Sequence, residues 1–393
     1  MKLSEDIIIY KNKDYSRVYN KFTNQMIELD NVLMDYLFKC QESKDFKNIY
    51  SELSNKQIEL LVKNGILIED IKAYKKKKFV SQELTKDNKI NTVYFHVTYK
   101  CNLKCEYCYQ NIYAKDHNMI DSTKDWKKIL RKLKFYDVKK IVITGGEPLL
   151  HPQIDQILKF AKSLGYEIDL LTNGSLIREK CDILNYADAI VMSLDGIESG
   201  LRKGLSISTI MENIKLVKER YTGIFKVRSV VSSGHEVASK RLGNYLQSIG
   251  IEQIETLRMP NNIKEINLMP DYRKFKLEDY ESLNAGCGAA DSVIAIDPLG
   301  DVYPCQLLMN EELRIGNILD DKFKELYLKG EIYNKIHSFD VYQDEECKHC
   351  ELIHYCSGGC PANSYKIYGN FSNRNDFMCD FYKYTWRCLH EKC

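Results

Sequence analysis

The sequence predicts an α/β fold with a small winged-helix domain before it and a cysteine-rich domain after it. Two observations on the 393-residue chain lead to this prediction. Apolar runs of strand length alternate with helix-length segments through the middle of the chain. Fourteen cysteines are spread unevenly, and nine of them follow residue 280. We therefore expect one central sheet and a separate domain organised by thiols.

Six apolar runs predict the strands of the central sheet. They cover residues 92–98, 140–144, 167–172, 189–194, 225–231 and 254–259. Helical spacing appears between them, as in residues 208–221, where Ile210, Ile214 and Val217 recur on one face. Six alternations of this kind predict parallel strands joined by right-handed crossovers. Such a sheet is open or curls into a partial barrel, and in both cases the loops after the strands form the site.

Charge and hydropathy exclude several classes of function. The chain carries 57 basic and 55 acidic residues, so its net charge of +2 gives no global field for nucleic acid. Its longest apolar runs are far too short to span a bilayer. The chain opens on a polar and charged stretch without a signal-peptide pattern. We expect a cytoplasmic protein with no nucleic-acid or membrane partner.

In a reducing compartment, many cysteines favour metal or redox chemistry over disulfides. Cys40 and Cys181 stand alone in the sequence, and we expect both to be small buried side chains. The other cysteines occur in groups. These groups are the candidate metal ligands.

The first group, Cys101, Cys105 and Cys108, follows the first predicted strand, and the sequence "GGEP" at 145–148 follows the second. Three thiolates can ligate three irons of a 4Fe-4S cluster and leave the fourth iron open. An open iron can chelate a small molecule through an amine and a carboxylate, and nearby glycines let a backbone approach that ligand. The spacing alone also allows a zinc site without its fourth ligand, or a loop with incidental thiols.

Together these residues resemble the radical SAM superfamily, with Tyr107 as the aromatic residue before the last cysteine. The resemblance implies that the open iron binds the amino and carboxyl groups of S-adenosylmethionine. It implies that Gly145, Gly146 and Glu147 contact the amino group of this cofactor. It also places Tyr107 near the adenine.

Further positions resemble the same family. Ser193 and Asp195 in "SLDG" and Arg202 in "GLRKG" match positions near the ribose and the carboxylate of the cofactor. The alternative for Ser193 is a strand-end cap. The alternative for Arg202 is a surface charge. The resemblance implies a partial (β/α)6 barrel of the TIM type. It also implies that an external one-electron reductant, such as flavodoxin or ferredoxin, reduces the cluster, which cleaves the cofactor to a 5'-deoxyadenosyl radical.

The later cysteines resemble the SPASM extension of radical SAM enzymes. The matching positions are Cys287, Cys305, Cys347, Cys350, Cys356, Cys360 and Cys379. A zinc ribbon explains a lone C-x2-C pair but not the whole series. The resemblance implies two auxiliary 4Fe-4S clusters, and so three clusters in all. By this resemblance, Cys347, Cys350, Cys356 and Cys379 ligate one, and Cys287, Cys305 and Cys360 ligate the other.

The second auxiliary set is one thiol short, because the residues just before Cys287 contain no cysteine. Either Cys388 or Cys393 completes it, or the cluster keeps an open iron. An open iron is a candidate site for a substrate cysteine thiolate.

The first part of the chain predicts a small winged helix. Strand-like runs at 6–11 and 17–23 precede helical stretches at 31–40 and 54–70. This pattern resembles the PqqD-like recognition domain of enzymes that modify ribosomally made peptides, a domain that binds a leader peptide as an added strand. A structural cap is the alternative. The lysine-rich residues 72–90 are the expected linker.

We therefore expect three domains. They are a PqqD-like domain over 1–85, a radical SAM core over 90–275 and a SPASM domain over 276–393. No catalytic residue is assigned, and His96 on the first strand is interpreted as a packing residue.

One departure bears on the reaction. Gln306 follows Cys305, whereas sulfatase-maturing relatives carry an aspartate there, so the proton acceptor proposed for formylglycine formation is absent. This favours a maturase of a precursor peptide that forms thioethers from a cysteine sulfur to a carbon, as in sactipeptides and ranthipeptides. The alternatives are carbon–carbon crosslinking or another oxidation of a peptide, formylglycine formation, and a non-catalytic iron-sulfur or zinc adaptor.

Overall fold

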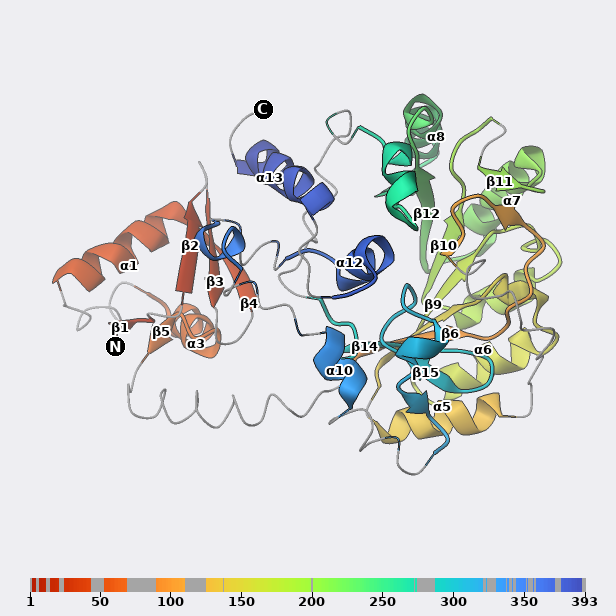
Figure 1. Ribbon diagram of the computed structural model, residues 1–393, viewed down its shortest axis with the longest axis horizontal. Coiled ribbons are helices and arrows are strands. Elements are labelled where there is room, and N and C mark those ends of the chain that lie inside the picture. Colours follow the sequence, from red (N-terminus) through yellow and green to blue (C-terminus); the bar gives the residue numbers. More distant parts are fainter. Residues whose placement is uncertain are drawn as a thin grey trace. The chain divides into compact units, whose positions relative to one another are not determined.

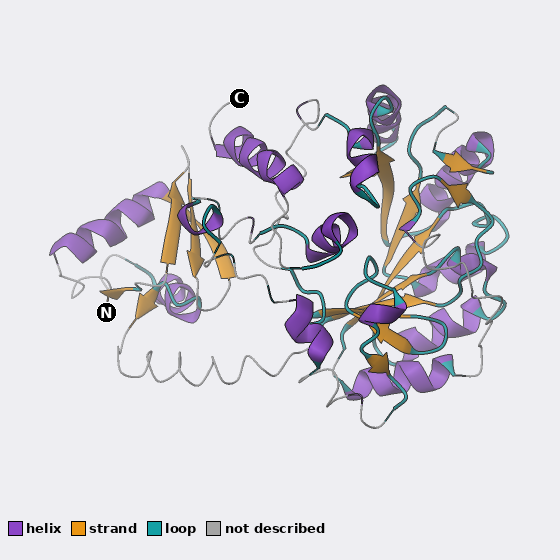
Figure 2. Cartoon of the chain, in the orientation of Figure 1, coloured by secondary structure: helices purple, strands orange, loops and turns teal. Residues whose placement is uncertain are grey.

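The structure is a computed structural model, shown in Figures 1 and 2. It describes residues 2–4, 7–11, 15–20, 25–43, 53–68, 90–109, 125–136, 138–198, 201–271, 273, 287–320, 323, 330–336, 338, 341, 344–350, 352, 356, 358–371 and 376–390. The chain divides into two compact units, residues 1–87 with 385–393, and residues 88–384. The predicted linker lies almost entirely outside the described residues.

The first unit contains a three-stranded antiparallel sheet. Its strands are β2 (Ile7–Lys11), β3 (Tyr15–Asn20) and β4 (Gln25–Asp30), in that order. Helices α1 (Asn31–Ser43) and α3 (Asn55–Lys63) follow, and β1 (Lys2–Leu3) pairs with β5 (Leu67–Ile68). The expected strands and helices are present, but β4 was not predicted. Its inward residues Ile27 and Leu29 alternate with polar ones over only six residues, which is a weak signal.

Apolar residues from both helices and the sheet form the core of this unit. Val18 on β3, Met34 and Leu37 on α1 and Leu61 on α3 are each at most 1% exposed. Cys40 belongs to the same core and is buried, as predicted. The winged-helix assignment and its role in peptide recognition stay predictions.

The second unit is built on a nine-stranded mixed sheet. The strands are β6 (Thr92–His96), β8 (Lys140–Thr144), β9 (Glu167–Thr172), β10 (Ala189–Ser193), β12 (Ile224–Val231), β13 (Glu252–Leu257), β14 (Val293–Ile296), β15 (Asp301–Tyr303) and β16 (Gly316–Asn317). Their spatial order is β13-β12-β10-β9-β8-β6-β14-β15-β16. The first six are all parallel and neighbour one another in chain order, which confirms the six predicted strands.

The sheet is larger than predicted, because three strands from the cysteine-rich part extend it. β14 joins parallel to β6, and β15 and β16 continue antiparallel. The resulting sheet is mixed rather than purely parallel. Closure into a partial barrel stays a prediction.

Helices pack on one face of this sheet. They are α5 (Trp126–Phe135), α6 (Ile154–Ser163), α7 (Ile207–Arg220) and α8 (Glu236–Ser248). On α7 the three residues that showed helical spacing, Ile210, Ile214 and Val217, are fully buried in the main core. Between β9 and β10 the chain forms only a 3-10 helix, Cys181–Tyr186. Cys181 is only partly buried there and accepts a hydrogen bond from Arg220, so the prediction that it is buried was wrong.

Alternate strand residues point away from the helices. On β6, Val93 and Phe95 belong to the helix-covered core, whereas Tyr94 and His96 lie between them in the sequence. Burial raises the pKa of the Tyr94 hydroxyl. The charge of Arg228 on β12 lowers this pKa, and the Cys305 thiol and Asp169 on β9 raise it further. The face opposite the helices therefore has charged side chains near Tyr94, and Tyr94 also packs there against Ala295, Tyr303 and Met309 of the cysteine-rich region.

The cysteine-rich region adds its own helices and a small core. The helices are α10 (Glu331–Ile336), α12 (Pro361–Tyr368) and α13 (Asp376–His390). Leu308, Leu313 and Phe371 are buried together, and the ring of Tyr365 stacks on that of Phe371 at 4.9 Å.

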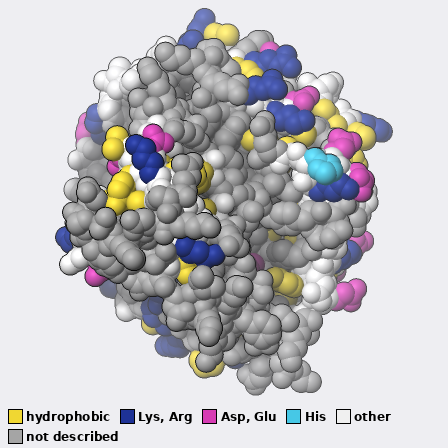
Figure 3. Space-filling view, turned by 90° about the vertical axis from the view of Figure 1, so that its left-hand side faces the viewer, with side chains coloured by type: hydrophobic (Ala, Val, Ile, Leu, Met, Phe, Trp, Pro, Cys, Tyr) yellow, Lys and Arg dark blue, Asp and Glu magenta, His cyan; other side chains and the backbone are white. Residues whose placement is uncertain are grey.

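The described surface is mixed in character. On the face shown in Figure 3, the described hydrophobic, basic and acidic side chains are interspersed. No helix among the described residues is long and apolar enough to cross a bilayer.

Candidate functional site

The first cysteine group lies in the loop that follows β6. Cys101 is exposed, while Cys105 and Cys108 are partly buried. A short strand, β7 (Lys104–Cys105), pairs with β11 (Arg202–Lys203), so Cys105 lies opposite Arg202. The loop is thus held by a segment nearly a hundred residues further along the chain.

The three thiols lie within electrostatic range of one another. Burial raises the pKa of the Cys105 thiol to about 11, against the lowering effect of Arg202, and the thiols of Cys108 and Cys101 raise it further. Three thiolates at such proximity repel one another, and a polynuclear iron centre is the kind of cation that stabilises them. The donor set therefore fits three irons of a 4Fe-4S cluster.

Gly145 and Gly146 are required by contact with the chain that leads into the cysteine loop. A Cβ at Gly145 would lie 2.4 Å from the carbonyl oxygen of Thr98, and one at Gly146 would lie 2.3 Å from that of Lys100. Gly145 also has φ +147. Gly146 N–H donates to Thr98 O and Glu147 N–H donates to Lys100 O, both at 2.8 Å. These glycines position the cysteine loop, a role in addition to the cofactor contact that the sequence predicts.

Glu147 is fully buried at the carboxyl end of β8. Its carboxylate accepts hydrogen bonds from Leu149 N–H at 3.0 Å, Thr172 Oγ1 at 2.7 Å and Asn173 N–H at 2.7 Å. Burial raises the pKa of Glu147 to about 7, although these bonds lower it. The carboxylate thus ties the end of β8 to the end of β9.

Asn102 and Asn173 were not predicted as site residues. Asn173 Nδ2 donates to Asn102 Oδ1 at 2.9 Å, and Asn102 Nδ2 donates to Ser175 Oγ at 2.9 Å. Asn102 directly follows Cys101, so this chain of bonds anchors the cysteine loop to the turn after β9. The available signal was "TNGS" at 172–175, a polar turn after a strand end, like "GGEP" after the strand before it.

Tyr107, Asp195 and Arg202 form one network beside the cysteine loop. The Asp195 carboxylate accepts from Arg202 Nη2 at 3.1 Å, from Val230 N–H at 2.9 Å and from the Tyr107 hydroxyl, and Arg202 Nε lies 3.0 Å from it. The Arg202 guanidinium also lies 5.4 Å from the centre of the Tyr107 ring. Arg202 is therefore a buried ion-pair residue, and the surface-charge alternative was wrong.

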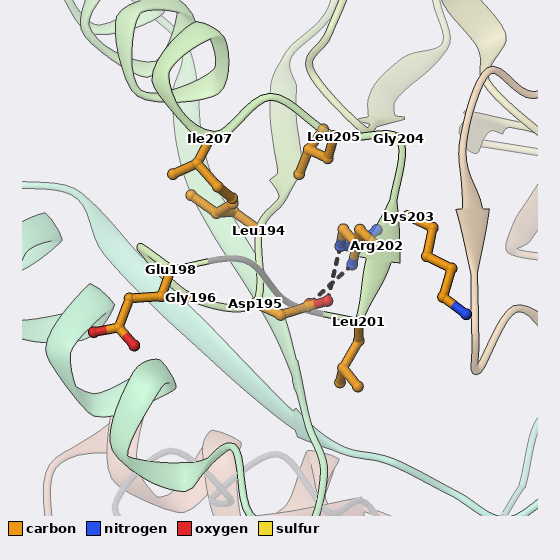
Figure 4. Close-up of a pocket in the computed structure, with 10 residues that line it drawn as sticks. All are labelled: Leu194, Asp195, Gly196, Glu198, Leu201, Arg202, Lys203, Gly204, Leu205 and Ile207. Carbon is orange, nitrogen blue, oxygen red and sulfur yellow. Dashed lines mark hydrogen bonds and ion pairs between the residues drawn. The ribbon is translucent and has the colours of Figure 1, made fainter.

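A cavity of about 300 Å³ adjoins this network, as Figure 4 shows. Asp195 and Arg202 point toward each other along one side of it, while Leu194, Leu205 and Ile207 lie in its wall. Its size is at the lower end of that of small-molecule sites.

Ser193 and His96, the two other residues considered from the sequence, lie at the ends of strands in this part of the sheet. Ser193 is the last residue of β10, two positions before Asp195, and it is partly buried. His96 ends β6 and is fully buried, with its ring 6.3 Å from that of Tyr109. Burial lowers the pKa of His96 to about 3, so the imidazole is neutral at pH 7. This agrees with the packing interpretation.

The later cysteines gather into two groups. Burial raises the pKa of Cys356 to about 12, against a hydrogen bond from Gly358, and the thiols of Cys379, Cys347 and Cys350 raise it further. These four residues come from the 3-10 helix Cys347–His349, the segment after it and α13.

The other group is Cys287, Cys305 and Cys360. Burial raises the pKa of Cys305, and the thiols of Cys360 and Cys287 raise it further. Cys305 follows β15, and Cys360 caps the start of α12. The assignment of these two groups as the ligands of two auxiliary clusters, which the sequence resemblance implied, stays a prediction. Cys393 lies outside the described residues, and the side chain of Cys388, on α13, is not described.

The donor chemistry of both groups fits iron-sulfur clusters, because thiolates are the ligands such clusters take. Among the described residues, no three His, Cys, Asp or Glu side chains converge on a point that would hold a single metal ion. Cluster ligands each bind a different iron and need not converge in that way.

Two family models match the chain. Residues 95–237 match the radical SAM superfamily, and residues 287–351 match the iron-sulfur cluster-binding domain called SPASM. The chain therefore contains a radical SAM domain followed by a SPASM domain. The second match covers Cys287, Cys305, Cys347 and Cys350 and ends before the other auxiliary cysteines.

Two curated relatives illustrate the similarity along the chain. Over 300 residues the chain is 27% identical to "Antilisterial bacteriocin subtilosin biosynthesis protein AlbA" of Bacillus subtilis, a match that covers 68% of this chain and 66% of that protein. Over 380 residues it is 26% identical to "Radical SAM cyclopropyl synthase TigE" of Paramaledivibacter caminithermalis, covering 83% of this chain and 79% of that protein. The chain thus spans just under two thirds of AlbA.

Solved structures show the same fold. The structure of Streptococcus suis SuiB bound to precursor peptide SuiA has a TM-score of 0.57 at 19% identity, covering 96% of this chain and 99% of that one. The structure of anSMEcpe with bound AdoMet and Cp18Cys peptide has a TM-score of 0.57 at 21% identity, covering 75% and 95%.

Proposed function

We propose that this protein is a radical SAM peptide maturase that installs thioether crosslinks, from a cysteine sulfur to a carbon, in a ribosomally made precursor peptide. The observation that carries the proposal is the set of three separate thiol groups in one unit, one beside the Asp195–Arg202 network and two in the cysteine-rich region. The proteins named in the comparisons support a peptide substrate, since SuiB was solved with a precursor peptide and AlbA is named for bacteriocin biosynthesis.

The residues of the chain take distinct parts in this proposal. Cys101, Cys105 and Cys108 would hold the cluster that binds S-adenosylmethionine. The Tyr107–Asp195–Arg202 network would orient the ribose and carboxylate of that cofactor. When bound, the cluster and cofactor supply a radical that abstracts hydrogen from a carbon of the substrate.

The cysteine-rich region would serve the second half of the reaction. Forming one thioether removes two hydrogens from the peptide, one as an atom taken by the radical and one as a proton and an electron. Cys287, Cys305 and Cys360 would hold an auxiliary cluster, and with three protein thiols this site would leave room for the substrate thiolate. The proton would leave to solvent, and the clusters, when bound, would supply an acceptor for the electron, with an external carrier of the flavodoxin or ferredoxin type as its final destination.

The precursor peptide would bind through its leader at the first unit. Its antiparallel sheet has β2 and β4 as outer strands, and an outer strand offers unpaired backbone groups to an extended peptide. We propose this unit as the PqqD-like recognition domain.

Carbon–carbon crosslinking is the second candidate. The match to the cyclopropyl synthase TigE, which covers 83% of this chain, favours it. Formylglycine formation is less well supported despite the shared fold with anSMEcpe, because Gln306 takes the position of the aspartate expected for that reaction.

The deciding experiment is anaerobic co-expression with the precursor peptide encoded beside the gene, followed by reduction, thiol alkylation and intact mass measurement. Thioether formation predicts a loss of two hydrogens for each cysteine that no longer alkylates. The same loss with every thiol still free would mean a carbon–carbon bond or a dehydrogenation. A variant with alanine at Cys101, Cys105 and Cys108 is the control and should leave the peptide unmodified.

A further inference from the structure

Arg228 on β12 lies on the face of the sheet opposite the helices. Phe225 and Val227, at alternate positions of the same strand, pack in the helix-covered core. Because successive strand residues point to opposite faces, the Arg228 side chain points away from the helices. Its register partner is Ser193 at the end of β10, the strand that lies beside β12 in Figure 1.

The guanidinium of Arg228 has no partner within the part of the chain that the structure describes. Its Nε is buried and makes no hydrogen bond there, and the side chain forms no ion pair with a described carboxylate. The residue as a whole is only partly buried, so a ligand can reach the rest of the guanidinium. An unsatisfied donor inside a protein is costly, and an acceptor from a bound molecule would remove that cost.

Described carboxylates on and just after the neighbouring strands already face other cations. The pairs are Glu252–Lys226 at 2.7 Å, Asp169–Lys140 at 2.9 Å, Asp195–Arg202 at 3.0 Å and Glu265–Arg258 at 3.7 Å. Glu255 on β13 accepts a hydrogen bond from Ser239 of helix α8, on the other side of the sheet. None of these carboxylates is therefore left to neutralise Arg228.

Arg228 adjoins the network that we assign to the cofactor. Val230, two residues further along β12, donates its N–H to the Asp195 carboxylate at 2.9 Å. Arg228 also lies on the same face as Tyr94, which packs against the cysteine-rich region. The charge of Arg228 lowers the pKa of the Tyr94 hydroxyl and the Cys305 thiol raises it, which agrees with this placement. A group bound by Arg228 would thus lie beside the cofactor network.

We propose that Arg228 binds a carboxylate of the precursor peptide and thereby selects which part of the peptide is held beside the cofactor. A guanidinium donates two parallel hydrogen bonds to a carboxylate, so it fixes the position of that group as well as balancing its charge. The carboxylates of a ribosomally made peptide are its Asp and Glu side chains and its C-terminus, all ionised at pH 7. This inference rests on the proposed function, which supplies the peptide substrate.

The test is an anaerobic assay of the full chain, reconstituted with iron and sulfide, on a synthetic copy of the precursor peptide encoded beside the gene. Each Asp and Glu of the peptide is changed in turn to Asn or Gln, and one further peptide has an amidated C-terminus. One of these changes should lower kcat/KM for the mass change by about tenfold or more with the unaltered protein. The same change should have little effect with Arg228→Gln, because the two partners act as one pair.

Lys226→Gln is the matched control. Lys226 lies two residues before Arg228 on the same face of β12, but Glu252 already pairs with it. Its loss should therefore leave the response to every acidic substitution of the peptide unchanged. Arg228→Lys keeps the charge without the two parallel donors and should retain part of the selectivity. Arg228→Met replaces Arg228→Gln if the latter fails to take up iron.

A second measurement distinguishes the peptide from the cofactor as the source of the carboxylate. Affinity for S-adenosylmethionine, measured by equilibrium dialysis, should be equal in Arg228→Gln and the unaltered protein. A weaker affinity, without any coupling to an acidic position of the peptide, would assign Arg228 to the cofactor carboxylate and overturn the inference.

The remaining outcomes separate the inference from the proposed function. Modification of the peptide with the same response to every acidic substitution in both proteins would overturn the role of Arg228 and leave the maturase function standing. No mass change in the unaltered peptide with the unaltered protein would overturn the proposed function, and the role of Arg228 with it.

Discussion

At the scale of single residues, the best-defined positions are those where two backbones meet without room for a side chain. Gly146 is such a position, because a Cβ there would meet the Lys100 carbonyl at 2.3 Å. The "GGEP" motif therefore has a structural reason inside the chain as well as a predicted cofactor contact.

Gly146→Ala should displace the segment that leads into the cysteine loop. Backbone atoms cannot yield as a flexible side chain does, so we expect a loss of about 3 kcal/mol of stability. Iron bound at the first cluster should fall with it, measured by iron content and EPR. Gly369→Ala is the control for steric contact, since its φ of +72° disfavours alanine but nothing lies within 4 Å of the added Cβ. Full iron in Gly146→Ala would show that the close approach is not needed.

Asp195→Asn should disable the network that orients Arg202. The substitution leaves a buried guanidinium without its charge partner, which costs about 3–5 kcal/mol in comparable pairs. We expect a lower melting temperature and an affinity for S-adenosylmethionine weaker by about tenfold or more, measured by equilibrium dialysis under anaerobic conditions.

The matched control for this variant is Glu198→Gln. Glu198 lines the same cavity but pairs with Arg241 at the exposed surface, so we expect a change of about 0.5 kcal/mol or less. Equal cofactor affinity in both variants would argue against a role for the Asp195–Arg202 pair.

At the scale of elements, helix α3 depends on its first turn. Ser54 and Gln57 form a capping box, in which Gln57 N–H donates to Ser54 Oγ and Ser54 N–H donates to Gln57 Oε1. The helix has only nine residues, so its cap adds to the stability that the buried Ile58 and Leu61 supply.

Ser54→Ala should therefore destabilise the first unit by about 1 kcal/mol. Thermal unfolding followed by circular dichroism of the full chain measures the change. Lys56→Ala, at an exposed position of the same helix, should have no such effect. Equal unfolding in the two variants would mean that the cap contributes little.

The elements also show what local patterns can and cannot predict. The six parallel strands were predictable, because each contains apolar residues in a run or alternation of strand length. β4 was missed because its alternation is short. β14 to β16 were missed as part of the sheet because β14 joins it by pairing with β6, about two hundred residues earlier, and β15 and β16 continue from β14.

At the scale of the whole molecule, the thiol groups limit how much iron the chain can bind. Cys347, Cys350, Cys356 and Cys379 would by themselves make up a complete set of four thiolates for one cluster. The remaining question is the fourth position of the group of Cys287, Cys305 and Cys360.

Alanine at Cys388 or Cys393 should leave the iron content unchanged if that fourth iron is open. Three clusters correspond to about twelve irons per chain. Iron and sulfide analysis of anaerobically reconstituted protein measures this directly, and Cys356→Ala is the positive control for loss. A drop in iron in either the Cys388 or the Cys393 variant would mean that the cluster is closed by a protein thiol.

The spacing of the cysteines along the chain was enough to indicate the first thiol group as a candidate cluster site, and the resemblance to known domains implied the two auxiliary groups of four and three thiols. Iron-sulfur clusters take thiolate ligands, which cysteines supply. The resemblance to known domains depends on the intervals between these cysteines. The folded chain alone revealed that Gly145 and Gly146 support the cysteine loop and that Asn102 and Asn173 anchor it. These are contacts between segments distant in sequence, and no local pattern encodes such distances.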